Sequence, residues 1–543
     1  MKRCISVIMI VFATCFWAMG CCPKNPTLNS AISAHGNTDW HIDTANEFLF
    51  GTDMAGADTA ANHCPDTWTR RHMHVDLTNT NHYYYDKDVT SGGEDTHATE
   101  GIDRAMLFFY AGHGCPTYWN TLGNDASQGN MRLGDCQNDN KGILRYYWQC
   151  SCEVFAHGPR TCPGAGFDYA CPGDFDGSAD SYNMRNVYER WGSVLSPQLR
   201  MACGASTPAY CHESQANRIW DRYNNMGFDV ADAFIDGLNV WGVVPLCITM
   251  GGADVNTTPL VTDSAFTNLP NTAGTSHYHI QYLSSFAGTP RSPSKVATQI
   301  PQTLPVYHLQ PLPVPKMFQR MKFSESGNII VTKDDTLKEP IEVRINRLSG
   351  AIYLRREGVV IQDKILDESM FLSQAKSIIM QYELMETQMN KPTAHKMMID
   401  TVPVKGAGKP AATVLKSVTV EFRRHVEYQG AKIDVLGDGG AITVRMNGDG
   451  SMQSVSKVWR PIAATKSLVP VKRFEEALAE AKAQLEKEEK YRLDSWNWGY
   501  KELDGNISQN RLGIVYQFAF MPKENKEMID FPPRMIEIHG QKE

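Results

Sequence analysis

The cysteines of this chain are confined to its first half, and this distribution limits how the chain can fold. All 14 cysteines lie at or before Cys247, and residues 248–543 contain none. Setting aside Cys4, Cys15 and Cys21, which belong to a targeting segment, leaves 11. In an oxidising compartment most of these should form disulfides, and an odd number permits one reactive thiol. The sequence therefore predicts a disulfide-stabilised N-terminal region followed by a region of different construction.

The first 21 residues have the pattern of an export signal. Lys2 and Arg3 supply positive charge, and the apolar stretch 5–19 that follows is too short to predict a transmembrane span. Small residues before Cys21 resemble the bacterial lipoprotein signal, in which that cysteine is acylated; an ordinary signal-peptidase cut nearby is the alternative. Both interpretations predict an exported protein, either a cell-surface lipoprotein or a secreted or periplasmic one. No later stretch reaches 18 apolar residues, so we expect membrane contact only through a lipid at Cys21.

Short apolar runs, separated by polar loops and helical patterns, organise residues 22–289. The runs are Met106–Ala111, Ile143–Trp148, Leu199–Ala202 and Val243–Met250. Each is followed by small or polar residues, as buried strands of an α/β sheet are. Because helical patterns lie between them, we expect a cysteine-rich α/β domain with a mostly parallel sheet and helices on both faces. Asp229 is expected to cap one of these helices.

The chain changes character after residue 289. Prolines recur between residues 290 and 315, which predicts an extended, semi-rigid linker. Beyond it, alternating strand patterns and two helical patterns predict two small α+β units, at 316–410 and 411–543, each a helix on an antiparallel sheet. In the first unit Asp367 is expected to cap the helix, with Met370 facing inward.

The motif Ala111-Gly112-His113-Gly114-Cys115 directly follows the first apolar run. Ligands gather at the carboxyl ends of strands in α/β folds, and histidine is the most frequent general acid or base. His113 is therefore a candidate base, and the backbone N–H of Gly114 a candidate oxyanion donor. Three downstream cysteines end strand-like runs and are candidate nucleophiles: Cys150, Cys152 and Cys203. A cysteine and a histidine at the ends of adjacent parallel strands can meet across the rim of the sheet.

These motifs resemble the caspase–legumain–gingipain superfamily of cysteine peptidases, in which one apolar strand ends in His-Gly and the next in a catalytic cysteine. The resemblance covers about residues 100–250 and implies a caspase-like fold and a peptide or protein substrate. The two catalytic residues are about 50 positions apart in caspases, which favours Cys152 as the nucleophile. Cys203 would need an insertion, and Cys150 is the other rival. The alternative, in a chain this rich in cysteine, is that Cys150 and Cys152 form disulfides with other cysteines, for instance Cys136, Cys162 or Cys171.

Asp174, Asp176 and Asp180 form a candidate calcium site. They surround a glycine in the run Asp-Phe-Asp-Gly-Ser-Ala-Asp, and carboxylate oxygens at such spacing suit a hard cation. The run is not a complete EF-hand loop, because it has no glutamate at the twelfth position. A solvated acidic turn is the alternative, and no other cofactor motif stands out.

The C-terminal region resembles the small propeptide-like α+β domains, of the PepSY type, that accompany secreted peptidases as inhibitors or folding aids. The resemblance rests on residues 420–426, 437–444 and 457–460. The alternative is an extracellular spacer or a binding module.

Together these features predict an exported protein similar to cysteine peptidases, hydrolysing amides through a Cys/His dyad. The alternative is a non-catalytic cell-surface binding protein, a pseudo-enzyme in which every cysteine is structural. The layout as a whole also resembles an uncharacterised family of exported microbial proteins. A net charge of −7, without a basic patch interleaved with aromatic residues, argues against a nucleic-acid partner.

Overall fold

The structure is a computed structural model of the 543-residue chain, and it describes most of residues 195–542. Its gaps in that range include 207–212, 286–299, 405–411, 504–510 and 524–533. Before residue 195 it describes only 41–46, 69–74, 107–111, 114–115, 118–120, 130–132, 144–150 and residue 155. The predicted signal segment 1–21, including Cys21, lies outside the described residues.

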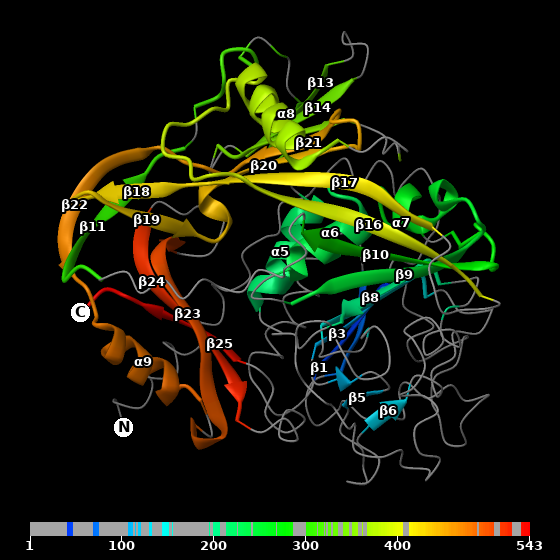
Figure 1. The fold of residues 1–543 in the computed structure, drawn as a ribbon, viewed down its shortest axis with the longest axis horizontal. Helices are drawn as coiled ribbons and strands as arrows, with labels where there is room; N and C mark the ends of the chain where they lie inside the picture. Colours follow the sequence, from blue (N-terminus) through cyan, green and yellow to red (C-terminus); the bar gives the residue numbers. More distant parts are fainter. Residues whose placement is uncertain are drawn as a thin grey trace, which may run out of the picture.

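Among the described residues, 15 strands form one large sheet. This sheet runs through the molecule (Figure 1). At one end, five strands pair in parallel in the order β2-β1-β3-β7-β8. Their bounds are His41–Asn46 for β1, Thr69–His74 for β2, Leu107–Ala111 for β3, Tyr146–Cys150 for β7 and Met201–Ala205 for β8. The next two strands, β9 (Pro245–Gly251) and β10 (His277–Ser285), continue the sheet with antiparallel pairing.

Strands from the C-terminal half extend this same sheet. β16 pairs antiparallel with β10, and the order continues β17-β20-β21-β15-β14-β13-β12. The bounds are Ser324–Ser326 for β12, Ile329–Asp334 for β13, Ile341–Asn346 for β14, Ile352–Arg356 for β15, Thr393–Pro403 for β16, Ala412–Arg423 for β17, Ala441–Met446 for β20 and Met452–Lys457 for β21. The large sheet is therefore built from residues on both sides of the predicted linker.

A second sheet has seven strands, in the order β18-β19-β23-β24-β11-β22, with β25 paired to β24. The bounds are Thr303–Leu309 for β11, His425–Tyr428 for β18, Ala431–Leu436 for β19, Ile462–Pro470 for β22, Tyr491–Leu503 for β23, Arg511–Pro522 for β24 and Arg534–His539 for β25. Helix α9 (Phe474–Ala483) lies against β24 and β25. Three short strands, β4 (Gly114–Cys115), β5 (Tyr118–Asn120) and β6 (Asn130–Arg132), form a separate small sheet.

The large sheet curls around two helices, α5 (Glu213–Asn224) and α6 (Val230–Leu238), which lie inside its curve in Figure 1. Eight of the nine residues of α6 are buried, as expected of a helix covered on all sides. Phe234 of α6 shares one hydrophobic core with Trp148 of β7 and with Tyr353 and Ile399 of the C-terminal strands. The short segments η5 (Val255–Thr257) and α7 (Pro259–Thr262) follow β9.

The predicted fold class, a mostly parallel α/β sheet of the caspase type with helices on both faces, is wrong. The described residues are mostly strand, and the large sheet is mixed, with antiparallel pairing from β8 onward. The apolar runs do form the strands β3, β7, β8 and β9. Their directions differ from the prediction because two helices, α5 and α6, connect β8 to β9. A helical hairpin returns the chain to the edge it left, so the next strand runs antiparallel.

The predicted strands of the C-terminal region are present, but their pairing does not follow the predicted unit boundaries. β16 and β17 lie on opposite sides of residues 410–411 and pair with each other. β11 lies inside the predicted linker 290–315 and is a strand of the second sheet. Strand pairing does not mark where one domain ends and the next begins, so the division of the chain into domains stays a prediction.

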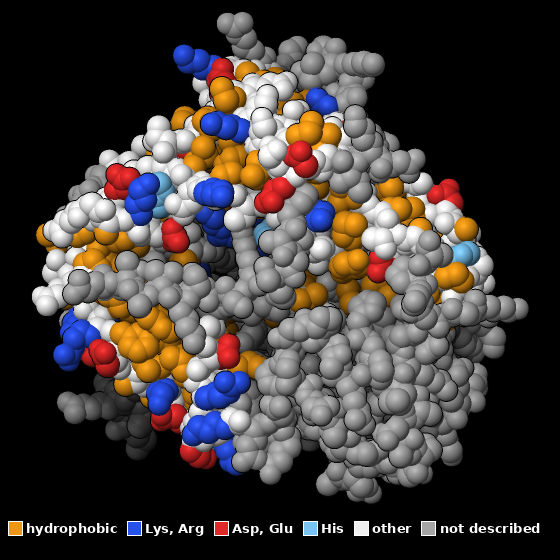
Figure 2. All heavy atoms as spheres, in the orientation of Figure 1, with side chains coloured by type: hydrophobic (Ala, Val, Ile, Leu, Met, Phe, Trp, Pro, Cys, Tyr) orange, Lys and Arg blue, Asp and Glu red, His pale blue; other side chains and the backbone are white. Residues whose placement is uncertain are grey.

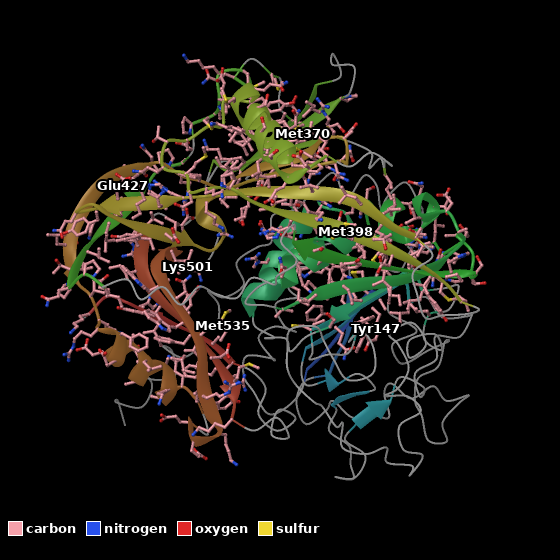
Figure 3. All side chains as sticks on the ribbon, in the orientation of Figure 1. Tyr147, Met370, Met398, Glu427, Lys501 and Met535 are labelled. Carbon is pink, nitrogen blue, oxygen red and sulfur yellow. A yellow bond between two sulfur atoms is a disulfide. The ribbon has the colours of Figure 1, made fainter. Side chains whose placement is uncertain are left out.

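Helix α8 (Glu368–Gln381) begins as the sequence predicts, with the Asp367 side chain accepting a 2.8 Å hydrogen bond from the Met370 backbone N–H. The orientation of Met370, labelled in Figure 3, is not as expected: its residue is 50% exposed. The core-facing residues are Phe371, Ala375, Ile378 and Ile379. Charged side chains of both signs are interspersed over the described part of the face in Figure 2. No described helix is long and apolar enough to cross a membrane.

Candidate functional site

The candidate site lies where β3 and β7 end. These strands are parallel neighbours, and their register pairs Leu107 with Tyr146 at one end and Ala111 with Cys150 at the other. Both strands therefore end at the same edge of the sheet. Ala111 is the second residue before His113, and Cys150 is the second before Cys152. The expectation that these two strand ends are adjacent is confirmed.

The proposed dyad itself, His113 and Cys152, lies outside the described residues. Gly114, the candidate oxyanion donor, opens strand β4 and pairs with Trp119 of β5. The chain thus enters a separate small sheet directly after the histidine. Cys150 is 3% exposed and packs in the hydrophobic core with Trp148, which makes its sulfur a poor candidate for reaching a substrate.

Cys203, the rival nucleophile with the longer spacing, is bonded to Cys247. The two residues lie directly opposite each other on the antiparallel strands β8 and β9, with their Cα atoms 4.0 Å apart. A disulfide sulfur cannot supply the thiolate that attacks a carbonyl. The structure therefore corrects the assignment of Cys203 to a catalytic role: the residue is structural and fully buried.

Beyond β7, the backbone returns to the same edge of the sheet. The N–H of Phe155 donates a 3.0 Å hydrogen bond to the carbonyl of Ala205, the last residue of β8. The side chain of Phe155 is completely buried. Cys150 and Phe155 are therefore both anchored at the carboxyl edge, on either side of the segment that contains Cys152.

The predicted calcium ligands, Asp174, Asp176 and Asp180, lie outside the described residues. Among the residues that the structure describes, no group of three histidine, cysteine, aspartate or glutamate side chains is arranged to hold a metal ion.

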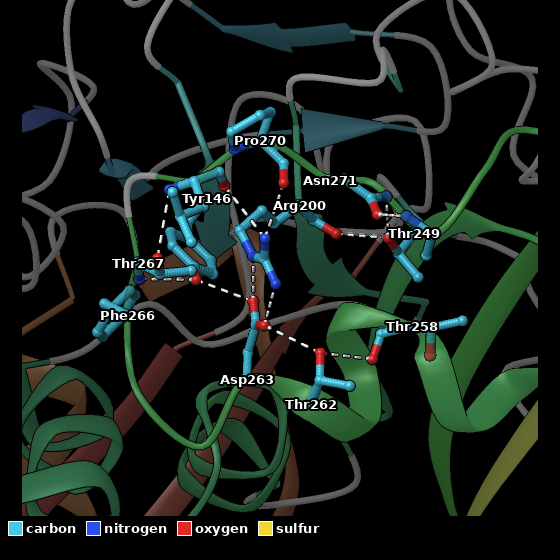
Figure 4. A network of polar contacts seen from close by, with 12 residues as sticks. Tyr146, Arg200, Thr249, Thr258, Thr262, Asp263, Phe266, Thr267, Pro270 and Asn271 are labelled. Carbon is cyan, nitrogen blue, oxygen red and sulfur yellow. Dashed lines mark hydrogen bonds and ion pairs between the residues drawn. The ribbon is translucent and has the colours of Figure 1, made fainter.

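A polar network occupies the opposite, amino edge of β7 and β8 (Figure 4). Arg200, which directly precedes β8, donates through Nε to Oδ2 of Asp263 at 2.6 Å and through Nη2 to Oδ1. The hydroxyl of Tyr146 donates to the same Asp263 Oδ2 at 2.9 Å and accepts from the N–H of Thr267 at 3.1 Å. Burial, together with the Asp263 carboxylate, raises the pKa of Tyr146 well above its usual value.

This network fastens the loop after α7 to the sheet. Arg200 Nη1 also donates to the carbonyls of Leu269 and Pro270, and Asn271 Nδ2 donates to the Met250 carbonyl at 2.7 Å. Burial acts to lower the pKa of Arg200, but the Asp263 carboxylate raises it by more. The pKa therefore lies above its usual value, and the guanidinium stays charged. Each polar group named here forms a hydrogen bond or an ion pair with another part of the chain, so we interpret the network as structural. Sequence reasoning missed it, since Arg200 and Asp263 are isolated charges far apart in the sequence.

Comparisons with known proteins give no family assignment. No family model matches the sequence, and no curated protein matches it. Among solved structures the chain is similar to an uncharacterized protein from Eubacterium rectale ATCC 33656, with 9% identity over 44% of this chain and 82% of that one, at a TM-score of 0.25. It is also similar to the Bacillus megaterium YpeB C-terminal domain, with 13% identity over 41% of this chain and 85% of that one, at a TM-score of 0.22. Scores this low do not establish a shared fold.

Proposed function

We propose that this protein is an amide hydrolase that works through a dyad of Cys152 and His113 at the carboxyl edge of β3 and β7. The supporting observation is the strand register: Ala111 lies opposite Cys150, and the two dyad residues follow these strand ends at equal distances along the chain. The proposal carries over only the local motif of the caspase–legumain–gingipain superfamily, a strand ending in His-Gly beside a strand ending near a cysteine. It does not require the fold of those enzymes.

The chemistry would proceed by acyl transfer. The Cys152 thiolate attacks the carbonyl carbon of a peptide bond, and the carbonyl electron pair moves onto oxygen, where the N–H of Gly114 stabilises it. His113 gives the thiol proton to the leaving amine as the C–N bond breaks. Water, deprotonated by His113, then cleaves the thioester, releasing the acid and regenerating the thiol.

An electrophilic peptidyl ketone tests this proposal on the full chain. Intact mass and peptide mapping should show one label on Cys152, and His113→Ala should slow labelling at least tenfold, because the imidazole no longer helps to form the thiolate. Cys150→Ser is the matched control: its sulfur is buried, so this variant should keep the wild-type labelling rate. Finding Cys152 in a disulfide of the native protein would exclude it as the nucleophile.

The second candidate function is a cell-surface binding protein with structural cysteines only. The bond between Cys203 and Cys247 favours it, because one of the three candidate nucleophiles already has a structural role. This alternative predicts that no cysteine of the native protein reacts with the ketone. Both proposals include export through the segment 1–21. N-terminal sequencing of the mature protein would test whether Cys21 is its first residue.

A further inference from the structure

The first turn of α6 carries two carboxylates that are buried inside the protein. Asp232 is completely inaccessible and Asp229 is 7% exposed. Asp229 occupies the N-cap position, as the sequence predicts, but its side chain makes no capping hydrogen bond. Buried carboxylates are costly unless cations or hydrogen-bond donors compensate them, so their partners matter for the whole fold.

Both carboxylates are compensated by cations from the C-terminal half of the chain. Lys416 of β17 places Nζ 3.0 Å from Asp232 Oδ2 and 3.2 Å from Asp229 Oδ2. Arg445 of β20 donates to Asp232 Oδ2 through Nη2. Burial raises the pKa of Asp232, but Arg445 and Lys416 together lower it well below its usual value. Asp232 is thus held ionised by residues that lie far beyond the predicted linker.

The ammonium group of Lys416 contacts several residues of the N-terminal half. Its side chain is completely buried. Beyond the two carboxylates, Nζ donates to the carbonyl of Leu260 at 2.5 Å and to Oε1 of Gln281 at 3.2 Å. Gln281 donates in turn to Asp232 Oδ1. These partners of Lys416, namely Asp229, Asp232, Leu260 and Gln281, all belong to the N-terminal half.

Two further strands of the C-terminal half, β14 and β15, hold the turn between α5 and α6. Arg344 of β14 donates a 2.9 Å hydrogen bond to the carbonyl of Asn224, the last residue of α5, where cations are favoured. Arg355 of β15 lies over Gly227 so closely that a Cβ there would be 2.9 Å from the arginine Cδ. Four cations from β14, β15, β17 and β20 therefore gather around one helical hairpin.

Backbone pairing joins the same two halves. β10 and β16 pair antiparallel over their length, from His277 opposite Pro403 to Ser285 opposite His395. Tyr353 and Ile399 enter the hydrophobic core that covers α6. Removing the C-terminal strands would expose that core and leave two carboxylates without counter-charges.

We propose that the C-terminal strands β14–β17 and β20 are a permanent structural partner of the α5–α6 hairpin, and that the C-terminal half is not a separable inhibitor or disposable folding aid. The N-terminal half reaches its native state only with these strands in place. This inference is independent of the proposed hydrolase activity, because it concerns no residue of the dyad.

A nick between the halves tests the inference on the full chain. A recognition sequence for a site-specific protease is inserted between residues 290 and 295, and the purified protein is cut. We expect the two fragments to co-elute on size exclusion at the volume of uncut protein, with an unchanged circular dichroism spectrum. Separation of the fragments, with the N-terminal fragment keeping its native spectrum, would overturn the proposal.

A pair of matched variants localises the effect. In the nicked protein, Lys416→Met should lower the urea concentration at which the fragments separate. The variant removes the cation that Asp229 and Asp232 share, so Asp229 loses its ion pair with Lys416 and Asp232 keeps only Arg445 of its two cationic partners. Lys501→Met removes a partly exposed lysine, labelled in Figure 3, whose Nζ is 2.7 Å from Glu537 within the C-terminal half. This control should leave the urea midpoint unchanged. Equal midpoints for the two variants would contradict the assigned role of Lys416.

Discussion

Gly237 of α6 lies directly against the backbone of Ile219 in α5. A Cβ at position 237 would be 2.6 Å from the Cα of Ile219 and 2.7 Å from its backbone nitrogen. Atoms of a packed backbone cannot give way as the end of a side chain can. The absence of a side chain at this one position therefore sets how closely the two buried helices approach.

Gly237→Ala should destabilise the protein, although alanine is the better helix former. Propensity alone would favour alanine by up to about 1 kcal/mol, but forcing the helices apart should cost about 1–3 kcal/mol. Urea unfolding followed by circular dichroism measures the difference. Ser373→Ala, at an exposed position of α8, is the control and should change the stability by less than about 0.5 kcal/mol. A stabilised Gly237→Ala variant would show that the helices can shift freely.

Asp263→Asn should weaken the anchoring of the loop after α7. The substitution leaves the Arg200 guanidinium, whose side chain is 11% exposed, without its anionic partner. Breaking a buried ion pair from one side costs about 3 kcal/mol, measured as the free energy of unfolding in urea. Lys482→Met breaks a surface pair with Glu488, whose side chain is 52% exposed, and should cost at most about 1 kcal/mol. Equal effects of the two substitutions would contradict the structural role of the network.

His279 should make stability depend on pH. Its Nε2 lies 2.8 Å from the Gly252 carbonyl and its Nδ1 3.0 Å from the Thr401 hydroxyl, inside the protein. Burial lowers the pKa of His279 below its ordinary value of 6.5, and the nearby His277 adds to this. The unfolded chain therefore binds a proton more readily than the folded one, so stability falls as the pH is lowered below 6.5.

The comparison with His279→Gln isolates this contribution. The glutamine does not titrate, so the free energy of unfolding of the variant should decline less between pH 7 and pH 5 than that of the wild type. Urea unfolding at several pH values checks this difference. Parallel pH profiles for the two proteins would mean that His279 takes up protons equally in both states.

The strands and helix starts of this protein could be predicted from sequence because they depend on local patterns. The apolar runs that became β3, β7, β8 and β9 and the cap at Asp367 are of this kind. Strand direction could not be predicted in the same way. It depends on whether one or two helices connect β8 to β9, and on how they pack against strands far away in the sequence.

The same distinction between local patterns and long-range packing applies to the candidate site and to the buried lysine. The adjacency of the strand ends beside His113 was predictable from two apolar runs and their short separation. Lys416, by contrast, stands beside Ser417 in an alternating run and reads as a solvent-facing lysine of an antiparallel strand. It is buried because the face of β17 that should have met solvent covers α6 instead. The local sequence around Lys416 does not indicate that β17 packs against a helix from the other half of the chain.

The bond between Cys203 and Cys247 should stabilise the sheet where its pairing changes from parallel to antiparallel. The bond closes a segment with a sequence separation of 44 that contains α5 and α6. A loop of this size loses considerable entropy in the unfolded chain, so replacing both cysteines by alanine should cost about 2–4 kcal/mol. Urea unfolding of the oxidised wild type and the double variant measures this loss. Adding a reductant under unfolding conditions should lower the wild-type stability toward that of the variant, while the variant should respond less. A wild-type protein whose Cys203 is alkylated before denaturation would show that the bond is absent, and would restore Cys203 as a candidate nucleophile.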